Sequence, residues 1–348
     1  MSLLHKVSWN RIVFDEAHHL RNSKTTRYIG ARLLTANIRW LVSGTPIQNR
    51  KQDFYSLCAL IRLPASFYTV TESVRLLASS FILKRTKKQV GIQISDICVE
   101  KSVVDWSSKK ERDLAEALHS GLKWSNGLST SVDPSVNASL SNLDVGDGKK
   151  AMLLQILRAK QMCIYPKLVF KGQGQGQGQG PDVGGCSSKL DAVVNSILEK
   201  KGNGSGKLVF CHFREEIDEI ANRLRNGGID RVATFDGRTS SAKRHEILCE
   251  KNEVLILQIQ TGCEGLNLQE NYSEIYFVAP HWNPAIEDQA IARCHRIGQS
   301  KTVYVHRFLM SSFVSDDEDV VTKTLDNHVC DVQKGKRRIC NEFIAEAS

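Results

Sequence analysis

A regular alternation of apolar strands and amphipathic helices begins at Ser187 and constrains the fold more than any other feature of the sequence. We predict helices over 215–225, 240–251 and 284–297, between strands at 207–210, 231–235, 254–260, 274–279 and 303–308. This alternation is typical of an α/β fold, in which a parallel sheet is covered by helices on both faces. Such sheets bind ligands at the carboxyl ends of their strands, so polar residues there are candidate site residues.

The segment 281–299, HWNPAIEDQAIARCHRIGQ, carries the signals of a helix with defined ends. Asn283 suits the N-cap, Pro284 suits the first helical position, and Gly298 suits the residue just past the end. We expect an apolar stripe at helical spacing to face the core, formed by Ile286, Ala290 and Ile297.

Three polar residues lie beside that stripe in the same segment. Gln289, Arg293 and Arg296 are spaced i, i+4 and i+7 and would share one helix face. An arginine stays charged, and its planar guanidinium matches phosphate oxygens. The segment therefore predicts a phosphate-binding edge, although a solvated polar face is the ordinary alternative for helical arginine.

Two carboxylates directly follow a short strand predicted at 7–14. Asp15 and Glu16 open the sequence DEAH. Carboxylates at the end of a buried strand are costly unless a cation uses them, and a magnesium–phosphate complex would do so. Asp15 would hold the Mg²⁺ ion and Glu16 could polarise an attacking water. An ordinary acidic helix N-terminus is the alternative.

A second short strand, predicted at 38–42, ends in Ser43-Gly44-Thr45-Pro46. Small hydroxyl residues with a glycine make a tight turn that has free donors, although a turn without function would look the same. A helix is predicted to follow and to stop at Pro64.

A third polar turn, at 261–267, follows the strand predicted at 254–260. Thr261 offers a hydroxyl, Gly265 allows close backbone approach and Asn267 offers an amide. Such a turn can bring backbone donors against phosphates, and a strained connector is the alternative.

Composition sets broad limits on the function. The chain has 348 residues, a length that favours two domains, and a net charge of +9, which is a mild bias toward polyanionic partners. Its ten cysteines include no C-x-x-C pair, so we expect reduced thiols in an intracellular protein rather than a disulfide framework or a zinc site. We find no apolar run of membrane-spanning length and no signal peptide.

A Gly-Gln repeat at 172–180 marks a linker or surface insertion. We also expect a strand near 103–106, a charged helix at 108–123 and a mobile loop over 125–148. The predicted organisation is a first lobe over 1–110, a helical insert and linker over 111–186, a second lobe over 187–315, and a tail over 316–348.

Taken in order, these pieces resemble the Swi/Snf-type ATPases, the double-stranded-DNA translocases of the helicase superfamily. The segment 282–299 distinguishes this family from ordinary RNA helicases. The motifs that carry the resemblance are DEAHHLRN (15–22), LVSGTPIQN (41–49), LKRTK (83–87), SSKLDAV (187–193), LVFCHF (208–213), FDGRT (235–239), TGCEGLNLQ (261–269) and WNPAIEDQAIARCHRIGQ (282–299).

The resemblance implies two RecA-like parallel-sheet lobes that hydrolyse ATP with Mg²⁺ and move along double-stranded DNA, in chromatin remodelling or in clearing proteins from DNA. It implies Asp15 and Glu16 as the groups for Mg²⁺ and water. It further implies ATP contacts by Gly265 and Gln289, arginine fingers at Arg293 and Arg296, and DNA contact or coupling by Ser43, Thr45, Thr261 and Asn267. Nucleosomes or DNA-bound proteins are candidate partners, and a nuclear location is expected.

One family motif is not found in this sequence. The phosphate-binding loop G-x-x-x-x-G-K-[ST] precedes the DEAH strand in the family, and the fourteen residues before Asp15 do not match it. We therefore expect a first lobe truncated at its N-terminus and no DNA-stimulated ATPase from this chain alone. A non-catalytic DNA-binding or scaffolding module is the main alternative, and an RNA helicase is a weaker one. A zinc-binding RING insert, the mark of the ubiquitin-ligase branch, is not found in the sequence.

Overall fold

The computed structural model describes residues 2–44, 51–83, 85, 89–120, 122, 148–170, 187–262, 266–314 and 321–346. Thr45, Gly265, the Gly-Gln repeat, most of the loop predicted over 125–148 and the acidic residues 316–319 lie outside these ranges. The chain divides into two compact units, one mainly of residues 1–90 and 333–348 and the other mainly of residues 91–332. Each unit is described by itself.

The first unit is built on two parallel strands, in agreement with the strands predicted at 7–14 and 38–42. Ser8 pairs with Thr35 at one end of the register and Phe14 pairs with Leu41 at the other. The elements of this unit are η1 (Leu3–Lys6), β1 (Ser8–Phe14), η2 (Ala17–Leu20), α1 (Thr26–Leu33), β2 (Thr35–Leu41), α2 (Lys51–Leu60), α3 (Ser66–Thr69) and α4 (Thr71–Phe81).

The core of the first unit is small, because few residues of the strand pair are covered. Leu20, Tyr28 and Leu57 are buried together, and the Tyr28 hydroxyl donates to the Ser56 carbonyl at 3.0 Å. By contrast, the paired residues Val13 and Trp40 are each about half exposed. Parallel strands are normally buried on both faces, so this pair has less cover than such strands usually require.

The second unit contains a six-stranded sheet in which every strand pair is parallel. The strand order is β3-β8-β7-β4-β6-β5. This result confirms the predicted α/β class with a parallel sheet. The strands are β3 (Ile97–Val104), β4 (Gly206–Cys211), β5 (Val232–Phe235), β6 (Val254–Gln258), β7 (Tyr272–Phe277) and β8 (Val303–Met310).

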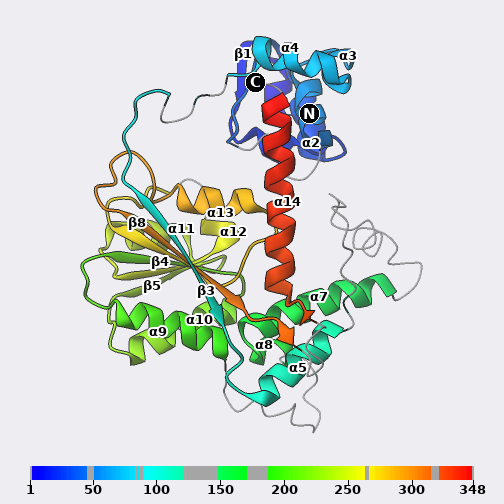
Figure 1. The fold of residues 1–348 in the computed structure, drawn as a ribbon. Helices are drawn as coiled ribbons and strands as arrows, with labels where there is room; N and C mark the ends of the chain where they lie inside the picture. Colours follow the sequence, from blue (N-terminus) through cyan, green and yellow to red (C-terminus); the bar gives the residue numbers. More distant parts are fainter. Residues whose placement is uncertain are drawn as a thin grey trace. The chain divides into compact units, whose positions relative to one another are not determined.

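Helices cover both faces of this sheet, as the apolar strands predict (Figure 1). Helices α9 (Ser188–Glu199) and α10 (Arg214–Asn226) pack on one face, with Val209 and Tyr276 from the strands. Ala290 of α13 (Pro284–Ile291) and Ile247 of α11 (Ser241–Cys249) pack on the other face, with Phe210 and Phe277 stacked at 5.3 Å. Burial on both faces explains why most residues of the central strands are apolar.

Strand β3 lies in the second unit, although residues up to 110 were expected in the first lobe. Its register with β8 runs from Ile97 opposite Val303 to Val104 opposite Met310. The pairing gives the outer edge of β8 a hydrogen-bonding partner, a long-range effect that the local pattern does not reveal. The other expected domain boundaries stay predictions.

Helix α13 is shorter than the sequence predicts. Its start is as expected, because the Asn283 side chain accepts a hydrogen bond from the Ala285 amide at 3.1 Å. It ends at Ile291, however, and turns replace the helix predicted up to residue 297. The Arg293 carbonyl accepts from the Leu268 amide at 3.1 Å instead of continuing the helix, and Ile297 is exposed rather than in the core.

The second unit also contains helices at the sheet's periphery. Trp106 stacks on Phe313 at 5.4 Å and donates to the Ser311 carbonyl at 3.2 Å. The remaining elements are α5 (Lys109–Ser120), α7 (Gly148–Ile164), α8 (Lys167–Phe170), α12 (Ile259–Gly262), β9 (Phe313–Val314), β10 (Val321–Thr322) and α14 (Leu325–Glu346), of which α14 belongs to this unit up to Val332.

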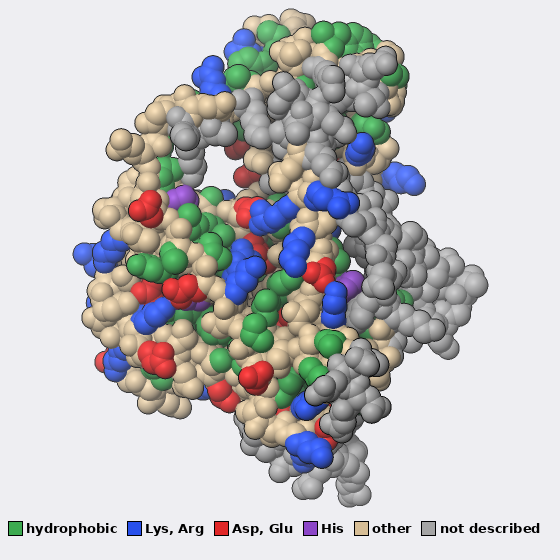
Figure 2. Space-filling view, viewed as in Figure 1, with side chains coloured by type: hydrophobic (Ala, Val, Ile, Leu, Met, Phe, Trp, Pro, Cys, Tyr) green, Lys and Arg blue, Asp and Glu red, His purple; other side chains and the backbone are tan. Residues whose placement is uncertain are grey.

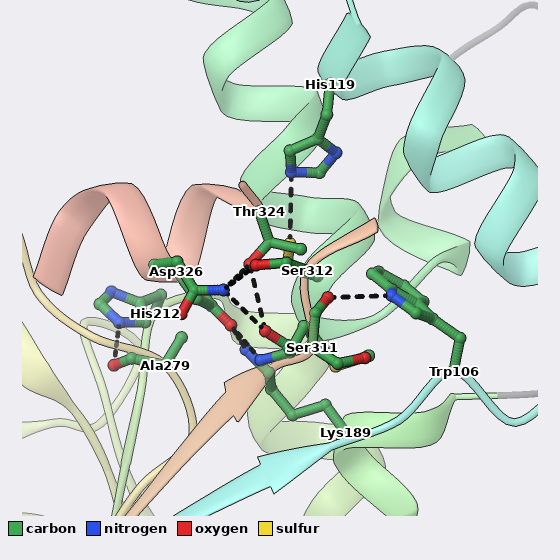
Figure 3. Close-up of polar contacts among 12 residues, drawn as sticks. Trp106, His119, Lys189, His212, Ala279, Ser311, Ser312, Thr324 and Asp326 are labelled. Carbon is green, nitrogen blue, oxygen red and sulfur yellow. Dashed lines mark hydrogen bonds and ion pairs between the residues drawn. The ribbon is translucent and has the colours of Figure 1, made fainter. Parts of the chain in front are cut away.

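A buried ion pair fixes the start of α14 in the second unit. The Lys189 ammonium of α9 contacts the Asp326 carboxylate, and both side chains are almost fully buried (Figure 3). The same Asp326 oxygen accepts from the Met310 amide at 3.0 Å, and the Thr324 hydroxyl donates to the Met310 carbonyl at 3.1 Å. These contacts join α9, the end of β8 and α14 in one polar cluster.

Candidate functional site

Glu16 follows β1 in a backbone conformation that is unusual for its residue type. Its φ and ψ are both 46°, in the left-handed region, at the N-cap of η2. The neighbouring Asp15 carboxylate accepts a hydrogen bond from the Glu16 amide at 2.8 Å, which supports this turn. A non-glycine residue in this region costs about 1–3 kcal/mol, and such strain is concentrated at functional sites.

His18 connects the two polar turns that the sequence predicts in the first unit. Its Nδ1 atom lies 3.2 Å from a Glu16 carboxylate oxygen and 3.4 Å from the Ser43 hydroxyl. His18 is buried, and its ring lies 4.3 Å from that of His19. His18 lies inside the DEAH motif, but the sequence predicts no role for it.

Backbone hydrogen bonds hold these two turns together at the carboxyl ends of β1 and β2. The Val42 amide donates to the Phe14 carbonyl, and the Ala17 amide donates to the Val42 carbonyl, both at 2.9 Å. The structure therefore places Asp15, Glu16 and Ser43 at one edge of the strand pair.

In the second unit, two predicted site segments come into contact. Arg296 donates to the side-chain oxygen of Asn267, and Arg293 Nη1 lies 3.5 Å from the Leu266 carbonyl. The arginines therefore contact the end of the polar turn predicted at 261–267, but they do so from turns and not from one helix face. Thr261 lies in α12.

Gln289 lies on α13 and is partly exposed, and buried charges position this helix. Glu287 is fully buried, pairs with Arg307 of β8, and accepts from the His281 amide at 2.7 Å. The Arg307 guanidinium also lies 5.2 Å from the Phe277 ring centroid. These contacts hold one end of α13, the helix that carries Gln289, on the sheet.

A second buried polar cluster stands at the carboxyl end of β4, within the motif LVFCHF (208–213). His212 Nε2 donates to the Ala279 carbonyl at 3.1 Å (Figure 3), so its Nδ1 can accept from Lys160 Nζ at 3.2 Å. Burial lowers the pKa of His212 well below its usual 6.5 and lowers the pKa of Lys160 to about 8. Burial also raises the pKa of Glu216 to about 7.

Two family models match segments of the chain that contain site residues of both units. Residues 1–71 match the SNF2-related domain, and residues 188–298 match the helicase conserved C-terminal domain. The chain is a Swi/Snf-type protein of the helicase superfamily. In this Swi/Snf-type chain, the first match contains Asp15, Glu16 and Ser43, and the second contains Asn267 and Arg296.

The Swi/Snf-type chain is also similar to longer curated proteins. It is 27% identical to a "Probable global transactivator" of Orgyia pseudotsugata multicapsid polyhedrosis virus, a match that covers 87% of this chain and 62% of the relative. It is 27% identical to an "Uncharacterized ATP-dependent helicase" of Mycoplasma pneumoniae (99% and 32%). It is 26% identical to the "ISWI chromatin-remodeling complex ATPase ISW2" of Saccharomyces cerevisiae (90% and 29%). The chain thus spans 29% to 62% of the length of these three relatives.

A solved structure, "Sulfolobus solfataricus SWI2/SNF2 ATPase core in complex with dsDNA", matches 91% of this chain and 66% of that chain, with 23% identity and a TM-score of 0.44. None of the helices in the described ranges has the length and apolar composition of a membrane span. The same ranges contain no group of three or more His, Cys, Asp or Glu residues that could hold a metal ion.

Proposed function

We propose that this Swi/Snf-type chain supplies parts of an ATP-driven motor that moves along double-stranded DNA, remodelling chromatin or removing proteins from DNA. The observation that carries the proposal is the strained Glu16 beside Asp15, held by His18 at the end of a parallel strand. The second unit supplies cationic groups, Arg293 and Arg296, within the matched helicase C-terminal domain. Two relatives, named as an ATP-dependent helicase and as a chromatin-remodelling ATPase, support the same activity.

We assign the Mg²⁺ contact to Asp15. This residue is exposed, and only one of its carboxylate oxygens has a hydrogen-bond partner among the described residues. A single available carboxylate fits Mg²⁺, which is commonly bound by one or two carboxylates together with substrate phosphates and water. When bound, the ion would neutralise charge on the phosphate oxygens of ATP.

The remaining roles in hydrolysis follow from charge and hydrogen-bonding capacity. The Glu16 carboxylate would orient and polarise the attacking water, with His18 fixing its position. Arg293 and Arg296 would stabilise the charge that develops on the transferred phosphate, a contribution on the order of 10³–10⁵ in rate in well-studied nucleotide hydrolases. Gln289 and Gly265 complete the proposed ATP contacts.

DNA contact is assigned to Ser43, Thr45, Thr261 and Asn267, as the family resemblance implies. Small hydroxyl and amide groups suit contact with the phosphate backbone, which carries no sequence information. On the face that Figure 2 shows, Lys and Arg side chains are interspersed with Asp and Glu. The net charge of +9 fits weak, salt-sensitive binding to the DNA backbone. We also propose nucleosomes as candidate partners and a nuclear location.

A non-catalytic DNA-binding or scaffolding role is the second candidate. It is favoured by one observation, that the sequence has no G-x-x-x-x-G-K-[ST] motif to hold the β- and γ-phosphates. Without such a loop, the triphosphate is not held in a fixed position where the arginines and carboxylates could act on it. An RNA helicase is less well supported, because the segment 282–299 resembles the corresponding segment of the DNA translocases.

The experiment compares ATP hydrolysis by this chain and by a longer version that carries an upstream phosphate-binding loop. We expect duplex DNA, but not RNA, to stimulate the longer version, and we expect Arg296→Ala to abolish the stimulation while Lys109→Ala leaves it unchanged. The chain alone should bind duplex DNA weakly and release no phosphate. Phosphate release by the chain alone that Arg296→Ala abolishes would refute the need for the loop, and an inactive longer version would favour the scaffolding role.

A further inference from the structure

A pocket lies at the amino ends of the strands in the second unit, on the sheet edge opposite to the one where the site was predicted. It has a volume of about 380 Å³ and is lined by the starts of β4 and β7 and by the segments that lead into β5, β6 and β8. A volume of this size is within the range of small-molecule sites, which run from about 300 to 1,000 Å³. None of the roles proposed above uses this pocket.

A glycine-rich loop, residues 202–206, forms one wall of the pocket and is held in a fixed shape. The side-chain oxygen of Asn203 accepts from the Ser205 amide at 3.0 Å and from Lys207 Nζ at 3.1 Å. The Asn203 amide nitrogen donates to Glu274 Oε1 at 2.6 Å. The wall is therefore preformed, which lowers the entropic cost of binding a ligand.

Glycine is required where this loop meets β7. A Cβ atom on Gly206 would lie 2.1 Å from the Asn271 carbonyl oxygen. Gly202 and Gly204 have positive φ values of 70° and 75°, a backbone conformation that side-chain-bearing residues rarely adopt. The Gly202 and Ser205 amides donate to Glu253 and Asn203, whereas the Gly204 amide can face a bound anion without obstruction by a side chain.

Cations outnumber carboxylates around the pocket. Arg231, Lys251 and Lys301 line it, as do Glu253 and Glu270. The Glu253 carboxylate accepts a hydrogen bond from the Gly202 amide at 3.1 Å, which partly compensates for its negative charge. Arg231 and Lys251 are exposed, and the structure shows no side-chain hydrogen bond or ion pair for either within the described part of the chain.

The pocket is also connected to the arginine-bearing turns. Gln299 lines it and donates through Nε2 to the Gln269 carbonyl at 2.9 Å and to the Tyr272 carbonyl at 3.0 Å. The Gln299 amide donates to the Arg296 carbonyl at 3.1 Å. A ligand in the pocket would thus contact the segment that directly follows Arg296.

We propose that this pocket binds a small phosphate-bearing anion through Arg231, Lys251 and the backbone amide of Gly204. Phosphate oxygens suit this set, because guanidinium, ammonium and backbone amide groups are all donors. The ligand chemistry is that of inorganic phosphate, pyrophosphate or a phosphorylated amino acid. The site differs from the proposed ATP site in its residues and in the sheet edge it occupies.

The test is a titration of the full chain, labelled with ¹⁵N-glycine, with pyrophosphate, and separately with inorganic phosphate and with phosphoserine. The amide resonances of Gly202, Gly204 and Gly206 report on the pocket itself, so the result does not depend on any ATPase activity. We expect saturable shifts of these resonances that weaken as salt is raised. The ranking of the three probes tells a free phosphate from a phosphorylated side chain.

The decisive variant is Arg231→Gln with Lys251→Gln, which removes both unpaired cations. We expect its affinity for pyrophosphate to fall about tenfold or more. The matched control is Lys101→Gln with Lys109→Gln, which removes the same charge from exposed positions of the same unit and should retain the parental affinity. Unmoved loop resonances, or equal affinity in the two double variants, would overturn the proposal.

Discussion

His18 Nδ1 lies 3.2 Å from a carboxylate oxygen of Glu16, and the same nitrogen lies 3.4 Å from the Ser43 hydroxyl. One buried imidazole therefore links the carboxylate proposed to orient water to the turn proposed to contact DNA. Two features therefore fix the position of the Glu16 carboxylate: its contact with His18 and the left-handed conformation of its own backbone.

Glu16→Gln, in the longer version that carries a phosphate-binding loop, should abolish ATP turnover while ATP binding survives. The amide keeps the size of the side chain but cannot polarise water as a carboxylate does. The measurements are phosphate release with duplex DNA and nucleotide binding at equilibrium. Turnover at the parental rate would show that Glu16 has another role.

Glu16→Gly in this chain should raise the free energy of unfolding of the first unit by about 0.5–1 kcal/mol, because glycine adopts positive φ without strain. Arg62→Gly is the matched control, since Arg62 has a φ of 65° and no proposed part in catalysis. Chemical unfolding measures both. A loss of stability in Glu16→Gly together with a gain in Arg62→Gly would mean that the Glu16 side chain stabilises the fold.

Lys189→Ala should destabilise the second unit by about 3–5 kcal/mol, because it leaves the buried Asp326 carboxylate without its cation. The double variant Lys189→Met with Asp326→Leu should lose much less, since neither charge then remains buried. Urea unfolding of the parent, of the single variants Lys189→Met and Asp326→Leu, and of the double variant forms a double-mutant cycle. Additive losses would show that the two side chains do not interact energetically.

The His212 cluster predicts a loss of stability in acid. Burial holds the pKa of His212 well below 6.5 in the folded state, so below pH 6.5 the unfolded chain binds a proton that the folded chain does not. The free energy of unfolding should therefore fall by up to about 1.4 kcal/mol per pH unit from this group as the pH drops below 6.5.

The variant His212→Gln tests that assignment. Its amide can still accept from Lys160 and donate to the Ala279 carbonyl, but it does not titrate. Urea unfolding of both proteins between pH 7 and pH 5 gives the difference that His212 makes, because other groups contribute equally to both. Parallel curves over this range would contradict the prediction.

A fragment of residues 91–332 should be more stable than a fragment of residues 187–332. The shorter one lacks β3, which pairs with β8 from Ile97 to Val104, and it lacks Trp106, which stacks on Phe313. Thermal unfolding of the two fragments compares them directly. Equal midpoints would show that β3 contributes little to the stability of the sheet.

The sequence alone determined the elements whose signals are local. Apolar runs with helices between them predicted the parallel strands of the second unit, because strands buried on both faces are apolar at most positions. Asn283 and Pro284 predicted the start of α13, since capping depends on neighbouring residues only. The DEAH carboxylates at the end of β1 were found in the same way.

Only the tertiary structure decided the features that depend on contacts between distant residues. Helix α13 ends at Ile291 because the Arg293 carbonyl bonds to the Leu268 amide, a partner twenty-five positions earlier in the sequence. Strand β3 joins β8 across about two hundred residues. The left-handed Glu16 and its contact with His18 depend on how the ends of β1 and β2 meet. Hydrogen bonds and packing between remote segments override local preference, and periodicity and spacing carry no signal of them.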